Sequence, residues 1–265
     1  MKKNLFKVLA TVFATVACVG CFSSCNKKDT LIVYTEAGFA PWEFTKEGST
    51  TVVGVDMEIA KYIADKYDWE LQVINGSFDS IVAGISEENA LGIAGISYSA
   101  ERAEAVEFSN FYWGSAYQTI VYKSDANVTL TEGNFAVSNL ADAKLVYQTG
   151  TTSQITVSEN GSDWGIASQA SFAQVMAALE DMKTASIEEY LVVDSQVAAQ
   201  LCANDSSIKY AAIEGLEAEQ YGIVAKKGNT ELIAKVNAAL AELLVEDANG
   251  TNQIEKWFVQ YSNAE

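Results

Sequence analysis

The stretch "LGIAGISYSAERAEAV" at residues 91–106 decides the fold class of this chain. Residues 91–96 form an apolar run with small side chains, which is typical of a buried strand. Residues 100–106 predict a helix. A strand followed at once by a helix is one half of a β/α unit, so the rest of the chain can be searched for the same alternation.

The alternation continues on both sides of this stretch. Strands are predicted at residues 30–35, 69–74, 116–123, 144–147, 190–193 and 220–225. Helices are predicted at 55–67, 78–85, 171–183 (with Ser171 as N-cap), 195–202, 230–245 and 252–258, and residues 150–153 open another helix. Such alternation predicts mostly parallel sheets with helices on their faces.

The pattern restarts after residues 116–123, which predicts two α/β units rather than one. Extended segments near 117–123 and 219–225 join the two units, and two chain crossings make a hinge. Ligands of open α/β sheets bind outside the carboxyl ends of the strands. The cleft between the two units is therefore the expected ligand site.

The N-terminus has the pattern of a targeting segment. Three lysines accompany an apolar run at residues 5–20, which is short for a membrane span and suits a signal peptide. The next residues resemble a bacterial lipobox, with Cys25 as the expected lipidation site and Cys21 as the alternative. A metal site on these closely spaced cysteines is disfavoured, because the chain has no histidine and a fourth ligand is missing.

The charge balance argues against two classes of partner. The chain has 17 basic and 35 acidic residues, and removal of residues 1–24 would take away three lysines and change the net charge from −18 to −21. Such a surface disfavours nucleic acid and anionic lipid, so attachment to a membrane is expected through the lipid anchor only. Without histidine, the site must use arginine, carboxylates, hydroxyls, aromatic rings and backbone. We expect no metal and no cofactor.

Arg102 is the only arginine in the chain, beside sixteen lysines. A guanidinium group grips a carboxylate with two parallel hydrogen bonds, which the point charge of a lysine cannot match. Arg102 is therefore a candidate for binding a carboxylate ligand. The alternative is an ion pair with Glu101, Glu104 or Glu107 on its own helix.

Seven short motifs together point to a family. They are "TEAGFAPWEF" (35–44), "VGVDMEIA" (53–60), "FDSI" (78–81), "AGISYSAER" (94–102), "VEFSN" (106–110), "YQTGTTS" (147–153) and "LVVDS" (191–195). In this order, behind a lipobox, they resemble the polar-amino-acid-binding proteins of ABC importers (bacterial solute-binding proteins, family 3). The resemblance implies an α/β, two-lobed periplasmic-binding-protein (Venus flytrap) fold, with two mostly parallel sheets joined by a two-strand hinge.

The resemblance also implies how the α-carboxylate of an amino acid is bound. Arg102 would grip it, helped by the Ser97 hydroxyl and the backbone of Gly95. Thr151 and Thr152 would reach the same carboxylate from the second lobe, where a helix start offers free N–H groups. Ordinary helix capping is the alternative for both threonines.

The remaining site residues would hold the rest of the ligand. By resemblance, Asp194 receives the α-ammonium group, although a carboxylate at this position is also a common N-cap. Phe39 and Phe78 would sandwich the ligand side chain, with a place in the core as their alternative. Glu36 and Gln148 would lie near the end of that side chain, which favours polar or cationic ligands.

The expected organisation and function follow from these roles. The segments are 1–24 (lipoprotein signal peptide), 25–29 (tether), 30–119 with 222–265 (first lobe) and 120–221 (second lobe). The expected function is extracytoplasmic binding of a free amino acid for the permease of an ABC importer, by a lipid-anchored monomer that is not an enzyme. The alternatives are a cyclohexadienyl dehydratase-like enzyme on the same fold, with Glu36 as its acid, or a detached amino-acid sensor subunit.

Overall fold

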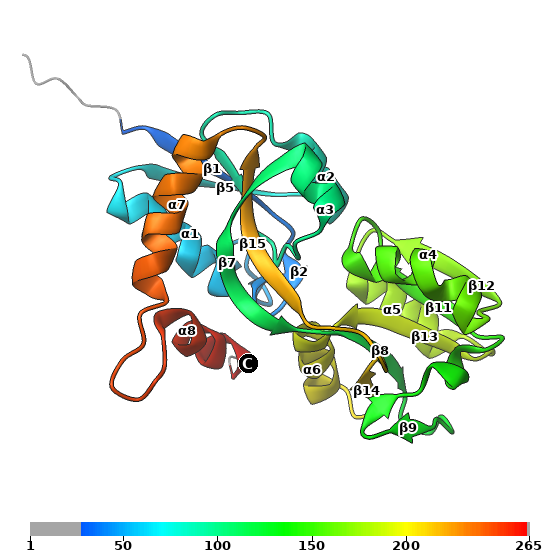
Figure 1. Ribbon diagram of the computed structural model, residues 1–265. Helices are drawn as coiled ribbons and strands as arrows, with labels where there is room; N and C mark the ends of the chain where they lie inside the picture. The colour runs from blue at the N-terminus through cyan, green and yellow to red at the C-terminus, as the bar shows by residue number, and fades with distance from the viewer. Residues whose placement is uncertain (1–27, 264–265) are drawn as a thin grey trace, which may run out of the picture.

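The computed structural model describes residues 28–263, which fold into two lobes (Figure 1). The sheet of the first lobe has the strand order β5-β1-β6-β15-β7. Its strands are β1 (Thr30–Thr35), β5 (Glu70–Asn75), β6 (Ala90–Gly92), β7 (Val106–Ala116) and β15 (Glu219–Lys226). Only β15 runs antiparallel to its neighbours in this sheet.

The sheet of the second lobe has the order β12-β11-β13-β8-β14 and one antiparallel strand, β8. Its strands are β8 (Gln118–Lys123), β11 (Lys144–Gln148), β12 (Ser168–Phe172), β13 (Glu189–Asp194) and β14 (Ile208–Ala212). Short strands form two further small sheets: β2 (Gly38–Phe39), β3 (Glu43–Thr45) and β4 (Val52–Val53) in one, β9 (Leu130–Thr131) and β10 (Asn134–Phe135) in the other.

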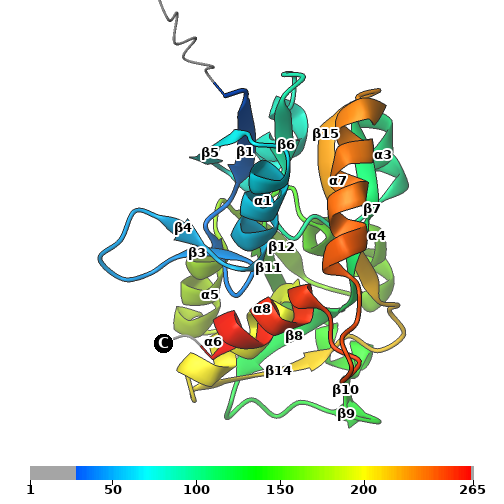
Figure 2. The same ribbon diagram turned by 90° about the vertical axis from the view of Figure 1, so that its left-hand side faces the viewer.

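Helices cover both faces of each large sheet. In the first lobe, α1 (Val55–Lys66), α7 (Thr230–Leu243) and α8 (Gln253–Ser262) pack on one face, and α2 (Phe78–Gly84) and α3 (Ala100–Ala105) lie on the other. Figure 2 shows α1 and α7 side by side. In the second lobe, α5 (Val175–Thr184) and α6 (Ser195–Asn204) pack on one face, and α4 (Thr152–Trp164) and the 3-10 helix η1 (Val137–Leu140) on the other.

Two chain crossings connect the lobes. The long strand β7 passes into β8 at Tyr117, and the chain returns from β14 to β15 through residues 213–218. Figure 1 shows β7 and β15 running together toward the second lobe. The predicted fold class is confirmed: an α/β architecture with two mostly parallel sheets and a two-strand connection. The exact lobe boundaries, at 119/120 and 221/222, stay a prediction.

Two local predictions differ from the structure. The predicted cap Ser171 lies in strand β12, and helix α5 begins only at Val175, because pairing with β11 extends the backbone of 168–172. The strand expected over 91–96 ends at Gly92, since Gly95 adopts a left-handed φ of 52° that turns the chain. In the two large sheets, strands β7, β12 and β14 were not predicted.

Some predictions concern residues outside this description. The signal peptide and the lipidation site at Cys25 lie within residues 1–27, which the structure does not describe. No helix in residues 28–263 combines the length and apolar character needed to cross a membrane.

Candidate ligand-binding site

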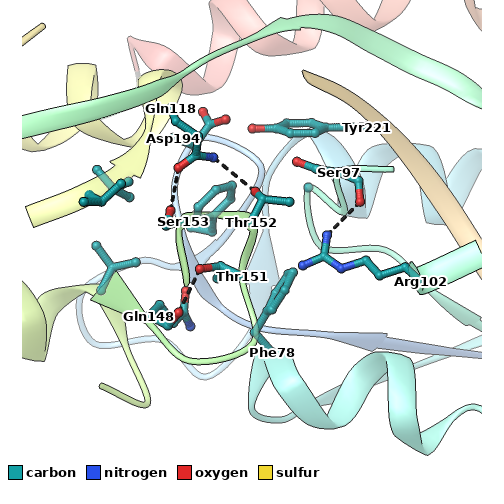
Figure 3. A pocket seen from close by; sticks show the side chains of 15 residues that line it. Phe78, Ser97, Arg102, Gln118, Gln148, Thr151, Thr152, Ser153, Asp194 and Tyr221 are labelled. Atoms are coloured by element: carbon teal, nitrogen blue, oxygen red, sulfur yellow. Dashed lines mark hydrogen bonds between the residues drawn. The ribbon is translucent and has the colours of Figure 1, made fainter. Parts of the chain in front are cut away.

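A small cavity lies between the lobes (Figure 3). All the predicted site residues except Glu36 line it. The complete lining is Phe39, Phe78, Gly95, Ser97, Arg102, Gln118, Gln148, Thr151, Thr152, Ser153, Val175, Val192, Val193, Asp194 and Tyr221. Residues scattered over more than 180 positions of sequence thus converge on one space, to which both sheets contribute.

Arg102 lies on α3 with its guanidinium group buried between the lobes. Nη1 donates to the Ser97 carbonyl at 2.7 Å, and Nη2 donates to the Gly150 carbonyl of the second lobe at 2.8 Å. The group also lies 5.4 Å from the centroid of the Phe78 ring. Burial lowers the pKa of Arg102 to about 10, so it stays charged at neutral pH. Arg102 makes no ion pair with residues 28–263, which argues against the alternative pairing on its own helix.

Asp194 ends β13 in the second lobe and is only 5% exposed. Its Oδ1 caps helix α6 by accepting from the Gln196 N–H at 2.8 Å, so the capping alternative is correct for this oxygen. Its Oδ2 has no hydrogen-bond partner among the described residues. Burial raises the pKa of Asp194 to about 7, which the nearby Tyr221 hydroxyl and the Gln196 N–H partly offset. One buried oxygen is therefore available for a cationic partner.

The turn before α4 brings the second lobe against the first. Gly150 has a φ of 79°, and a Cβ atom there would lie 2.7 Å from Cβ of Asp79. Thr151 is the N-cap: its hydroxyl accepts from the Gln154 N–H at 3.4 Å and donates to the Gln148 carbonyl at 2.8 Å. Its hydroxyl is thus already engaged, and the first N–H groups of α4 are the donors that this turn can offer.

Gly95 shapes the cavity but cannot donate to a ligand. Its N–H donates to Oδ2 of buried Asp56 at 2.8 Å, and the Tyr112 hydroxyl donates to Oδ1 at 2.9 Å. The expectation that Gly95 N–H helps to bind a carboxylate is therefore wrong, since Asp56 already accepts that hydrogen. A Cβ atom at Gly95 would also lie 2.8 Å from the Phe39 ring, so this wall requires glycine.

Glu36 lies behind the cavity wall rather than in it. The side chain is 3% exposed and lies beside the Gln148 amide, which offsets part of the rise in the Glu36 pKa caused by burial. Gln148 itself lines the cavity and donates to the Ala173 carbonyl at 3.1 Å. A buried carboxyl group therefore lies beside Gln148, which in Figure 3 is at the end of the cavity opposite Tyr221.

Sequence reasoning missed Glu219 and six residues of the cavity lining: Gln118, Ser153, Val175, Val192, Val193 and Tyr221. Gln118, Ser153 and Glu219 form a hydrogen-bonded group at the hinge, where Ser153 donates to Oε1 of Gln118 at 2.7 Å and the Gln118 amide donates to Glu219 at 2.9 Å. For Gln118 and Glu219, which begin strands β8 and β15, the position beside the two chain crossings was the available signal, because a hinge borders the cleft it closes.

Residues 31–260 of this chain match the model of the family described as "Bacterial extracellular solute-binding proteins, family 3". The chain belongs to this family. The match confirms the resemblance drawn from the seven motifs, and it makes the protein a member of a family of extracellular binding proteins.

Several similar proteins are named as amino-acid-binding proteins. The chain is 27% identical to the arginine-binding extracellular protein ArtP of Bacillus subtilis, over 97% of this chain and 98% of ArtP. It is 23% identical to the L-cystine-binding protein TcyJ of Escherichia coli, over 90% and 86% of the two chains. An ancestral arginine-binding protein solved with arginine superposes with a TM-score of 0.76 at 29% identity, covering 88% of this chain and 98% of that one.

Proposed function

We propose that this protein captures a free amino acid between its lobes and delivers it to the permease of an ABC importer. The main support is that two unlike charges, the Arg102 guanidinium of the first lobe and Oδ2 of Asp194 in the second, line the same cavity. A free amino acid is a zwitterion and needs both kinds of partner at a fixed separation. Arg102 would bind the α-carboxylate and Asp194 the α-ammonium group.

The hydrogen-bonding capacity of Arg102 fits this role. A guanidinium group has five N–H donors, and the two contacts with the Ser97 and Gly150 carbonyls leave three of them for a ligand. The N–H groups at the start of α4 would add donors from the second lobe.

Closure of the two lobes follows from the same arrangement. A ligand shifts a conformational equilibrium only through its differential affinity for the two states. A zwitterion held by Arg102 on one lobe and Asp194 on the other makes its full set of contacts only when the lobes are together. The direct bond between Arg102 and the Gly150 carbonyl would then be part of the closed state.

We further propose a cationic ligand, with L-arginine as the first candidate. The Phe39 and Phe78 rings flank the cavity, and the buried Glu36 carboxyl beside Gln148 would meet the end of a long basic side chain. The names of the relatives ArtP and the ancestral arginine-binding protein support the same choice. The proposal includes a lipid anchor at Cys25 and a monomeric state.

A thermal-shift screen with the twenty amino acids and cystine tests the function, because a ligand that binds only the folded state raises its melting temperature. We expect the largest shift with L-arginine, and titration calorimetry should then give a Kd of about 1 μM, or about −8 kcal/mol. Absence of any shift across the panel would contradict the proposal. Formation of phenylpyruvate from prephenate would instead favour the dehydratase-like alternative.

A further inference from the structure

Glu219 is the first residue of β15, at the mouth of the hinge, and its carboxylate is held by three segments of the chain. Its Oε2 accepts from the Ser97 hydroxyl of the first lobe and from the Thr152 hydroxyl of the second, the latter at 2.9 Å. Its Oε1 accepts from the Gln118 amide at 2.9 Å. Glu219 therefore joins both lobes through hydroxyls that line the ligand cavity.

The backbone fixes this arrangement. Residues 96–98 pair with β15, where the Tyr98 N–H donates to the Gln220 carbonyl at 2.9 Å and the Gly222 N–H donates to the Ile96 carbonyl at 3.0 Å. Ser97 is thus held directly beside the strand that begins with Glu219. On the other side, Gln118 is itself fixed by the Ser153 hydroxyl.

A hydroxyl group has only one hydrogen to donate. Since Ser97 and Thr152 both donate to Glu219, neither can donate to a ligand carboxylate at the same time. Their oxygens still have lone pairs: two on Ser97, and one on Thr152, which also accepts from the Gln118 amide at 3.1 Å. Toward the cavity, both groups are therefore acceptors.

We propose that Glu219 is a positioning residue that creates the α-ammonium subsite, by turning the Ser97 and Thr152 hydroxyls into acceptors that act together with Asp194. An ammonium group has three N–H donors, which match these three acceptors. Ser97 and Thr152 bond to the same oxygen of Glu219, and both line the cavity that Asp194 also lines. In Figure 3 both lie, like Asp194, on the Tyr221 side of the cavity.

This inference rests on the proposed amino-acid binding and deepens it. It reverses the role that the family resemblance implies for the Ser97 hydroxyl, which moves from the carboxylate to the ammonium end of the ligand. The α-carboxylate is then left to Arg102 and the N–H groups of α4. In this role Glu219 stays in place when the ligand binds. If it only occupied the position of the ligand carboxylate, a bound amino acid would displace it.

The test compares Glu219→Gln with the wild type on three probes: L-arginine, 5-guanidinopentanoic acid, which lacks the α-amino group, and agmatine, which lacks the α-carboxylate. Loss of the carboxylate frees the hydroxyls from their fixed orientation, so affinity for L-arginine and agmatine should fall about 30-fold. Affinity for the deaminated acid should change less than about threefold. Glu217→Gln, which removes the same charge from an exposed neighbour, should leave all three unchanged.

Two other results with Glu219→Gln would overturn the inference. Equal losses for all three probes in Glu219→Gln would show a purely structural role. Tighter binding of L-arginine would show that Glu219 competes with the ligand carboxylate. Wild-type protein is titrated first: if it binds another amino acid, that ligand and its deaminated and decarboxylated analogues replace the three probes. If it binds none, the proposed function fails, and this inference fails with it.

Discussion

Arg102→Lys is the most informative single substitution. It keeps the positive charge but removes the planar guanidinium group, which can bind a carboxylate with two parallel hydrogen bonds. Lysine would lose one arm of a bidentate carboxylate contact and the bond to the Gly150 carbonyl across the lobes. With charge-assisted hydrogen bonds each worth about 1.5–3 kcal/mol, we expect a net loss of about 3 kcal/mol, or roughly 150-fold in Kd. Titration calorimetry with L-arginine at pH 7.5 measures this directly.

The matched control is Glu101→Gln, which changes an exposed charge next to Arg102 on the same helix and should leave the Kd within about threefold. Circular dichroism checks that both variants keep the wild-type fold. If the folded Arg102→Lys protein bound L-arginine within about threefold of the wild type, Arg102 would not be the carboxylate partner.

Three further predictions concern other parts of the site. Since the pKa of Asp194 is about 7 and an ammonium ligand requires its ionised form, Kd should rise roughly tenfold per pH unit below 7, and Asp194→Asn should abolish this slope. Gly95→Ala should weaken binding more than tenfold and lower the melting temperature by about 2–4 °C, because its Cβ meets the Phe39 ring and its φ is positive. Glu36→Gln should reduce affinity for L-arginine more than affinity for L-glutamine.

Each of these predictions has its own control. The raised pKa of Asp194 also means that the unliganded protein should gain stability as pH falls from 7 toward 4, opposite to its ligand affinity, so weaker binding at low pH cannot be blamed on unfolding by this group. Gly133→Ala has a similar positive φ with nothing within 4 Å, and should cost stability without changing Kd. Equal losses for arginine and glutamine in Glu36→Gln would contradict a cationic subsite.

The sequence was sufficient for the fold class because strong periodic segments dominate it. The strand at 30–35 and the helix from Val55 were predicted from apolar spacing alone, and both occur. Strand β12 could not be predicted in this way, since "SQASF" has no strand pattern and is extended by its pairing with β11. Tertiary contacts override local propensity at such edges.

The site was partly predictable for a similar reason. Arg102 is conspicuous as the only arginine, and the seven motifs identified the other candidate site residues by their positions in the sequence. Glu219 has no such signal, because it is one of 35 acidic residues and its role arises from hydroxyls 67 and 122 positions away. The sequence also gave no sign that the Gly95 N–H is already hydrogen-bonded, since its acceptor Asp56 is 39 residues away.

The central claim is that both charged ends of one amino acid are held between the lobes, by Arg102 on one side and Asp194 on the other. The most direct measurement is calorimetry of the wild-type protein with L-arginine, agmatine and 5-guanidinopentanoic acid. We predict that each truncated analogue binds at least about 100-fold more weakly than L-arginine, because each leaves one buried charged group of the protein unpaired. Binding of either analogue within about threefold of L-arginine would contradict the claim.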